Sequence, residues 1–279
     1  MALLTACVAR PVATIEVSAA PTSLSTVTPS PTPTAAFEVD YRELPTNYDG
    51  DKRLVGLYVP KLEPGRKVPL VVMLHAYRSS PFGANMLAHF DLVAERYGAI
   101  VAYPPSAGPG WDADGSPGAP DRDSRYLSAL LTHLIAELPV DPRRVFVAGF
   151  SVGAEMADRV GCEFADRVAA VAIVSGTPWS DRCQPDRPVS VLVMHGTADS
   201  TFDYASAQTL AERWRRADGC SGDPTNSQLG PTATAEIVDG CHAGTEVEFV
   251  TFAGGTHEWF QEPDATQLAW QFFIAHPRS

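Results

Sequence analysis

The stretch Gly149-Phe150-Ser151-Val152-Gly153 decides the predicted fold. An apolar run at 144–148 precedes it and predicts an interior strand, and apolar residues recur at helical spacing after it. A G-x-S-x-G sequence between a strand and a helix is typical of a sharp turn that holds its serine above a sheet. Glycines suit the flanking positions because side chains there would collide with the neighbouring strand and helix. Ser151 is therefore a candidate nucleophile, and the Val152 N–H, at a helix N-terminus, is a candidate oxyanion donor.

The rest of the chain alternates apolar strands with amphipathic helices. Continuous apolar runs predict buried strands at 69–75, 99–103, 168–174, 189–195 and 247–252. Helical spacing predicts helices over 85–97, 126–138, 205–217 and 266–274. Polar and apolar residues alternate within 37–60, which indicates antiparallel strands at a sheet edge. This order predicts an α/β fold with a doubly wound, mostly parallel sheet and no separate lid domain.

Composition excludes several classes of protein. The chain has 279 residues, 45% of them hydrophobic and 19% charged, which is normal for a globular protein. A net charge of −12 argues against nucleic acid and anionic membrane surfaces as partners. Residues 1–36 differ from the remainder, so we expect one catalytic domain over 37–279.

The N-terminal segment predicts a tethered protein. Residues 11–36 are rich in Pro, Thr, Ser and Ala, a composition typical of an extended linker. Ahead of them, Leu4-Thr5-Ala6-Cys7 resembles the lipobox of bacterial lipoproteins, which implies lipidation of Cys7 and a membrane tether. Only six residues precede Cys7, and the alternative is a chance cysteine in a disordered tail. A secreted or cell-surface location is expected.

The other four cysteines favour an exported protein with disulfides. The most local of the three possible pairings joins Cys162 to Cys183 and Cys220 to Cys241. The second bridge would close a flexible loop, 221–240, and so remove chain entropy from the unfolded state. The alternative is four free, buried thiols in a cytosolic protein.

Two further residues complete a catalytic constellation with Ser151. Asp199 and His257 each follow a predicted strand, and functional residues gather at the carboxyl ends of such strands. An imidazole can take the serine proton and return it to a leaving group, and a carboxylate fixes the imidazole tautomer. The order Ser, Asp, His is that of the α/β-hydrolase fold. Asp203 is the alternative acid, and His195 is interpreted as a structural residue at a strand end.

The chain from about residue 50 onward resembles the polyhydroxybutyrate (PHB) depolymerase-like esterases, a family that includes feruloyl and acetylxylan esterases. The matching stretches are Leu74-His75, Tyr103-Pro104, 140–145, 149–153, 195–199 and 254–259. The resemblance implies a serine esterase that forms an acyl-serine intermediate and needs no metal or cofactor. It also implies that Ser151, Asp199 and His257 are the catalytic residues.

One stretch departs from the family pattern. The family usually has His-Gly after the first core strand, whereas this chain has His75-Ala76-Tyr77. A glycine there lets the backbone approach the oxyanion, so Ala76 leaves the geometry of this loop open. By position, the Tyr77 N–H is the second oxyanion donor beside that of Val152. The Tyr77 ring is also a candidate to flank an aromatic acyl group.

Aromatic side chains in loops are candidates for substrate binding. Besides Tyr77 they are Trp111, Trp179, Phe202 and Trp259. They would line an apolar cleft for an aromatic or polyester chain. The alternative is that they pack the bases of the loops.

The sequence leaves the substrate open. Feruloylated or acetylated polysaccharide, polyhydroxyalkanoate and aromatic polyester all fit, and a monomer is expected. Alternatives are a peptidase or other acyl hydrolase with the same triad, and a non-catalytic binding protein on a hydrolase scaffold. Sequence motifs for metal, redox or nucleotide chemistry were not found.

Overall fold

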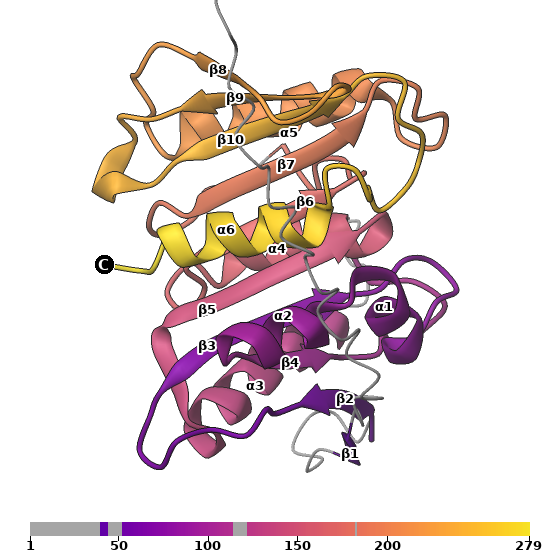
Figure 1. The fold of residues 1–279 in the computed structure, drawn as a ribbon, viewed down its shortest axis with the longest axis vertical. Coiled ribbons are helices and arrows are strands. Elements are labelled where there is room, and N and C mark those ends of the chain that lie inside the picture. The colour runs from indigo at the N-terminus through magenta and orange to yellow at the C-terminus, as the bar shows by residue number, and fades with distance from the viewer. Residues whose placement is uncertain (1–39, 44–51, 114–121, 182) are drawn as a thin grey trace, which may run out of the picture. The chain divides into compact units, whose positions relative to one another are not determined.

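One mixed sheet forms the centre of the part of the chain that the structure describes, residues 40–43, 52–113, 122–181 and 183–279. In this computed structural model the order of its ten described strands is β1-β2-β4-β3-β5-β6-β7-β10-β9-β8 (Figure 1). Strands β4, β3, β5, β6, β7 and β10 are parallel, and the pairs beyond them are antiparallel. The bounds are β1 (Asp40–Glu43), β2 (Leu54–Tyr58), β3 (Val68–Leu74), β4 (Ile100–Tyr103), β5 (Val140–Phe150), β6 (Ala170–Val174), β7 (Ser190–Gly196), β8 (Thr225–Gln228), β9 (Ala233–Val238) and β10 (Val247–Phe252). The predicted doubly wound, mostly parallel α/β sheet is confirmed.

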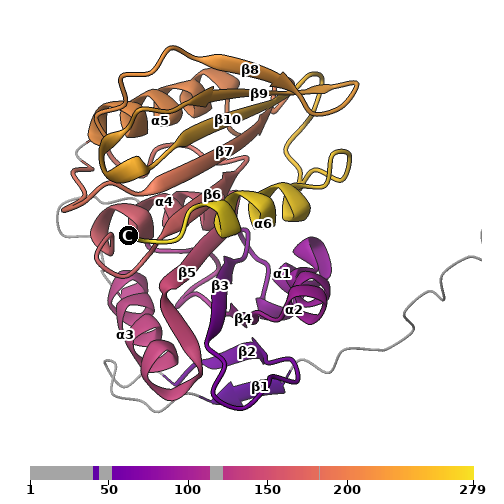
Figure 2. The same ribbon diagram turned by 60° about the vertical axis from the view of Figure 1, so that its left-hand side comes forward.

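Helices cover both faces of the sheet (Figure 2). Helices α3 (Arg122–Glu137), α4 (Val152–Glu163) and α5 (Tyr204–Ala217) pack their apolar residues on one face. Helices α1 (Pro81–Ala88), α2 (Phe90–Tyr97) and α6 (Ala265–Ala275) pack on the other. A short 3₁₀ helix, η1 (His242–Gly244), precedes β10. Because both faces are covered, the central strands are apolar throughout, as parallel strands require.

The single helix predicted over 85–97 is wrong. The chain forms α1 and α2 instead, and His89 between them adopts a left-handed conformation with φ 48°. Ser80 starts α1 by accepting a hydrogen bond from the Gly83 N–H, with Pro81 at the first helical position. Met86 in α1 is 53% exposed, whereas Phe90 in α2 is fully buried.

The flexible loop predicted over 221–240 is also wrong. Strands β8 and β9 form a hairpin there, and β9 pairs with β10 to extend the sheet. Ala233 and Ala235 of β9 are fully buried against the core, while Thr234 and Glu236 on the other face are half-buried beside α5. Such alternation predicts a strand, but the many Gly, Pro and Ser residues around it led to the prediction of a flexible loop.

Two disulfides join Cys162 to Cys183 and Cys220 to Cys241. Both predicted pairings are confirmed, and the alternative of four free thiols is wrong. The predicted linker at 1–36 and the lipobox-like segment with Cys7 lie outside the described residues. No helix in the described part of the chain is long and apolar enough to cross a membrane.

Candidate active site

The turn between β5 and α4 holds Ser151 in a strained conformation. Its backbone has φ 58° and ψ −125°, which non-glycine residues rarely adopt. The flanking glycines make this turn feasible. A Cβ at Gly149 would lie 2.0 Å from the Gly153 carbonyl oxygen, and one at Gly153 would lie 2.4 Å from the Leu74 oxygen. The sequence-based reason for these glycines, collision with the neighbouring strand and helix, is therefore confirmed.

Ser151, His257 and Asp199 form a continuous hydrogen-bonded chain. His257 Nε2 lies 2.9 Å from Ser151 Oγ, and His257 Nδ1 lies 2.8 Å from Asp199 Oδ2. The three residues follow β5, β10 and β7, so three strands that are remote in sequence deliver them to one edge of the sheet. A carboxylate accepts from Nδ1–H, which leaves Nε2 unprotonated and able to take the serine proton. The arrangement can thus activate an oxygen nucleophile.

The Asp199 carboxylate is buried and fully hydrogen-bonded. Its Oδ1 accepts the N–H groups of Thr201 at 2.8 Å and Phe202 at 3.0 Å. Burial disfavours ionisation, but the bonds from Phe202, His257 and Thr201 outweigh it and hold the pKa of Asp199 below its ordinary value. The alternative acid, Asp203, is exposed and instead caps α5 by accepting from the Ser206 N–H.

His195, interpreted from sequence as a structural strand-end residue, lies against the triad aspartate. Its side chain is fully buried, and Nε2 donates to the Phe202 carbonyl at 2.9 Å. The same nitrogen lies 3.3 Å from Asp199 Oδ2. Burial lowers the pKa of His195, which favours the neutral ring with its one proton on Nε2. The sequence missed this contact, although the spacing His195-x-x-x-Asp199 contained it.

The loops that carry Asp199 and His257 are bonded to each other. Ala198 N–H donates to the Gly255 carbonyl at 2.9 Å, and Gly254 N–H donates to Thr197 Oγ1 at 2.8 Å. The approach is so close that a Cβ at Gly196 would lie 2.2 Å from the Gly255 oxygen. These contacts hold the relative positions of the acid and the base.

A second contact steadies the His257 loop from the elbow side. Ser175, just after β6, is fully buried and its Oγ donates to the Glu258 carbonyl at 3.1 Å. Ser175 also has a positive φ of 49°, an uncommon conformation that marks a constrained position. Nothing in the sequence pattern distinguished it.

The two residues predicted to donate to the oxyanion have side chains beside the same loop. The Tyr77 ring and the Val152 side chain both pack against Gly110. Within the described part of the chain, neither the Tyr77 N–H nor the Val152 N–H donates to a protein acceptor. Both donors therefore remain for a ligand.

The predicted aromatic cleft needs correction. Trp111 is 7% exposed and donates its indole N–H to the His75 carbonyl, and Trp259 is 3% exposed and donates to Thr266 Oγ1. Both rings pack the bases of loops, which was the alternative interpretation. Trp179 is half-buried beneath Arg159, whose guanidinium carbon lies 5.1 Å from the ring centroid.

Two phenylalanines flank the catalytic imidazole. The rings of Phe202 and Phe150 lie 5.5 Å and 5.2 Å from that of His257. Phe202 was predicted as a substrate contact, whereas Phe150 was missed even though it is part of the elbow. Tyr77 is 53% exposed, with its ring against Gly110. Phe150 and Phe202 are therefore in ring contact with the catalytic imidazole.

Comparison with known proteins agrees with this geometry. Residues 54–183 match the family model described as Esterase PHB depolymerase. This region resembles the PHB depolymerase-like esterases, and the match covers just under half of the chain. It contains Ser151 and both proposed oxyanion donors, whereas Asp199 and His257 lie beyond it.

Relatives extend the similarity beyond this region. The chain is 28% identical over 259 residues to feruloyl esterase B of Piromyces equi, covering 82% of this chain and 44% of that protein. It is 28% identical over 244 residues to feruloyl esterase D of Neurospora crassa, covering 82% of this chain and 79% of that protein. The chain thus spans less than half of the Piromyces relative.

A solved structure supports the α/β-hydrolase fold. The acetyl xylan esterase from Aspergillus awamori superimposes with a TM-score of 0.67 at 20% identity, covering 85% of this chain and 97% of that one. At this identity the similarity concerns the fold alone.

Proposed function

We propose that this chain is a serine esterase that cleaves carboxylic esters through an acyl-serine intermediate. The observation that carries the proposal is the Ser151–His257–Asp199 chain, with links of 2.9 and 2.8 Å on the turn of the PHB depolymerase-like region. The names of the relatives, feruloyl esterases, support ester rather than amide substrates.

The reaction follows from the positions of the protons. Ser151 Oγ attacks the ester carbonyl carbon as its proton passes to His257 Nε2. The tetrahedral intermediate then expels the alcohol, which takes the proton from His257. A water molecule, deprotonated by the same nitrogen, attacks the acyl-serine, and the acid leaves as Ser151 regains its proton. Throughout, ionised Asp199 stabilises the imidazolium that forms in each half-reaction.

The oxyanion of each intermediate is proposed to lie between the N–H groups of Tyr77 and Val152. The position of both side chains beside Gly110, and the lack of protein acceptors for both N–H groups among the described residues, support this role. In a phosphonate-bound crystal structure, a phosphoryl oxygen within about 3.1 Å of both nitrogens is expected. A much longer distance to the Tyr77 nitrogen would reject that donor. It would also show that the loop with Ala76 in place of glycine does not bring the backbone to the oxyanion.

Substrates of the feruloyl- or acetyl-polysaccharide type are proposed first, and polyesters second. Phe150 and Phe202 offer apolar surface beside the imidazole for an aromatic acyl group, and Tyr77 is a further exposed ring on the proposed oxyanion loop. We expect an exported protein, since the two disulfides require an oxidising compartment. Lipidation of Cys7, a monomeric state and the linker at 1–36 stay predictions.

A substrate panel tests the proposal. Wild type and Ser151→Ala are assayed on a p-nitrophenyl ester, methyl ferulate, acetylated xylan, polyhydroxybutyrate and an aromatic polyester. We expect turnover of at least one ester by wild type and loss of about 10⁴-fold or more in the variant. The amide of ferulic acid is included to test the peptidase alternative. Turnover of the amide faster than of methyl ferulate would favour a peptidase, and no turnover at all would favour a binding protein.

A further inference from the structure

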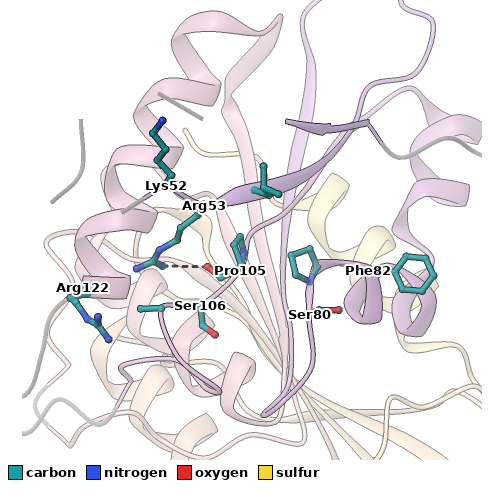
Figure 3. A pocket seen from close by; sticks show the side chains of 10 residues that line it. Lys52, Arg53, Ser80, Phe82, Pro105, Ser106 and Arg122 are labelled. Atoms are coloured by element: carbon teal, nitrogen blue, oxygen red, sulfur yellow. Dashed lines mark hydrogen bonds between the residues drawn. The ribbon is translucent and has the colours of Figure 1, made fainter. Parts of the chain in front are cut away.

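A pocket of about 620 Å³ opens beside the candidate active site without including any triad residue. The residues before β2, the start of α1, the loop after β4 and the start of α3 surround it. Figure 3 shows Lys52 and Arg122 on one side, Pro105 and Ser106 between, and Ser80 and Phe82 on the other side. Its volume falls within the usual range of ligand pockets, roughly 300–1,000 Å³.

The pocket lies at the same edge of the sheet as Ser151. It includes residues that follow the carboxyl ends of β3 and β4, and β3 is the direct neighbour of β5. At about 4.8 Å between strands, β4 and β2 lie roughly 10–15 Å from β5. That distance is suited to the part of a polymer next to the ester that reacts.

Its wall is also joined to the loop that carries Tyr77. The Ser106 N–H donates to His75 Nε2 at 3.2 Å, two residues before Tyr77. The wall of the pocket and the proposed oxyanion loop are therefore directly connected.

The pocket presents positive charge. Arg53 has a structural role: it is buried and donates to Asp123 Oδ1 at 2.6 Å and to the Pro105 carbonyl at 3.3 Å. The side chain of Arg122 is 47% exposed, and its one described ion pair, with Asp112, is long at 3.9 Å. Lys52 is exposed at the rim. On a chain of net charge −12, two solvent-facing cations at one pocket are a local reversal of sign.

The remaining lining has the chemistry of a saccharide site. Phe82 is 61% exposed and offers a ring face on which the C–H face of a sugar can pack. Ser80 Oγ accepts the Gly83 N–H, which leaves its own hydrogen for another acceptor. Ser106 Oγ donates to the Gly108 carbonyl, which leaves its lone pairs for a sugar hydroxyl.

We propose that this pocket binds a carboxylate-bearing sugar unit, a uronic acid branch of the polysaccharide whose ester is held at Ser151. Arg122 binds the carboxylate, Lys52 adds positive charge at the rim, Phe82 packs against the ring, and the serines meet its hydroxyl groups. This inference rests on the proposed esterase function and narrows its substrate to acidic polysaccharide esters.

Binding to the Ser151→Ala protein tests the site apart from catalysis. Isothermal titration calorimetry compares a xylo-oligosaccharide bearing one glucuronic acid with the neutral oligosaccharide of equal length. The acidic ligand is expected to bind about tenfold more tightly at low salt and to lose that advantage in 0.5 M NaCl. Lys52→Gln combined with Arg122→Gln should abolish the preference, while Lys61→Gln, an exposed lysine outside the pocket, should retain it. Equal affinity for the two oligosaccharides, or a preference that survives the double substitution, would overturn the proposal.

A parallel assay keeps the two proposals distinguishable. With Ser151 intact, Lys52→Gln/Arg122→Gln should hydrolyse methyl ferulate at the wild-type rate, and should raise KM about tenfold only for acidic, esterified xylan. Equal loss on both substrates, with an unchanged melting temperature, would place these residues in the reaction and contradict a polymer subsite. Failure of the wild type on every ester would reject the esterase function, whereas the calorimetric result would still decide whether acidic sugar binds.

Discussion

An aspartate is buried at each end of strand β7, and the pKa values of the two carboxyl groups are shifted in opposite directions. At the carboxyl end, Asp199 receives N–H groups from Thr201, Phe202 and His257, and its pKa is lowered. At the amino end, Asp218 Oδ1 accepts only from Val189 N–H at 3.2 Å, and Oδ2 has no hydrogen-bond partner among the described residues. Burial raises the pKa of Asp218 to about 7.

The difference shows what the active-site end of the strand supplies. Burial alone disfavours the ionised carboxylate at both positions, so burial does not explain why Asp199 is ionised. The turn after β7 adds backbone donors and the loop after β10 adds the His257 imidazole, and these keep Asp199 ionised where the mechanism needs a charge. Substitutions that remove the charge of either aspartate, or a donor beside Asp199, should therefore have different effects at the two ends of β7.

The largest effect is expected for Asp199→Asn. The amide keeps the size of the side chain but loses the charge and favours the wrong tautomer of His257, so kcat should fall about 10⁴-fold. Steady-state kinetics on methyl ferulate or the best ester of the panel would measure it. Asp203→Asn, one turn along the same loop, is the matched control and should stay within about twofold, since Asp203 only caps α5. A larger loss of kcat in Asp203→Asn than in Asp199→Asn would instead identify Asp203 as the acid of the triad.

A smaller effect is expected at His195, which we interpret as a positioning residue. His195→Ala removes the Nε2–H that bonds Phe202 O and lies 3.3 Å from Asp199 Oδ2, so kcat should fall about 10- to 100-fold with KM unchanged. His195→Gln, which retains an N–H donor on a side chain of similar length, should recover most of the rate. A residue needed only for packing would instead lower the melting temperature of both variants and leave kcat of the folded fraction intact.

The smallest effect concerns stability, at the other end of the strand. Between pH 4 and 7 the folded protein keeps a proton on Asp218 that the unfolded chain has lost, so the free energy of unfolding falls as pH rises through this window. Asp218→Asn removes that fall. Its melting temperature should therefore match the wild type near pH 4 and exceed it by a few °C at pH 8, at about 2–4 °C for each kcal/mol.

The exposed residue Asp223 provides the control for this experiment, since Asp223→Asn should shift the melting temperature equally little at both pH values. Burial also raises the pKa of Glu248 to about 7, but its contribution is common to all the proteins compared and cancels in the differences. A gain for Asp218→Asn that is as large at pH 4 as at pH 8 would contradict a buried, protonated carboxyl.

The parts of the molecule predicted from sequence are those governed by local rules. Ser151 was identifiable because strand, glycine-bounded turn and helix are adjacent in sequence. The predicted positions of Asp199 and His257 followed from one topological rule about strand ends, and the structure brings both to Ser151. Local loop closure likewise gave both disulfides.

Contacts between distant segments were not predictable in this way. Ser175 meets the Glu258 carbonyl across 83 residues, and a serine after a strand has no pattern that signals such a partner. Trp111 and Trp259 were assigned to a cleft because they occur in loops, but each finds a hydrogen-bond acceptor beneath the surface and is buried there. A loop in sequence is not the same as an exposed position in space.

The measurement that tests the central claim most directly is covalent labelling by a fluorophosphonate, followed by peptide mass spectrometry. An activated nucleophile should give one stoichiometric adduct on the peptide carrying Ser151, with none in Ser151→Ala and much slower labelling in His257→Ala. A label on a different residue, or equal labelling of wild type and Ser151→Ala, would contradict the assignment of Ser151 as the nucleophile.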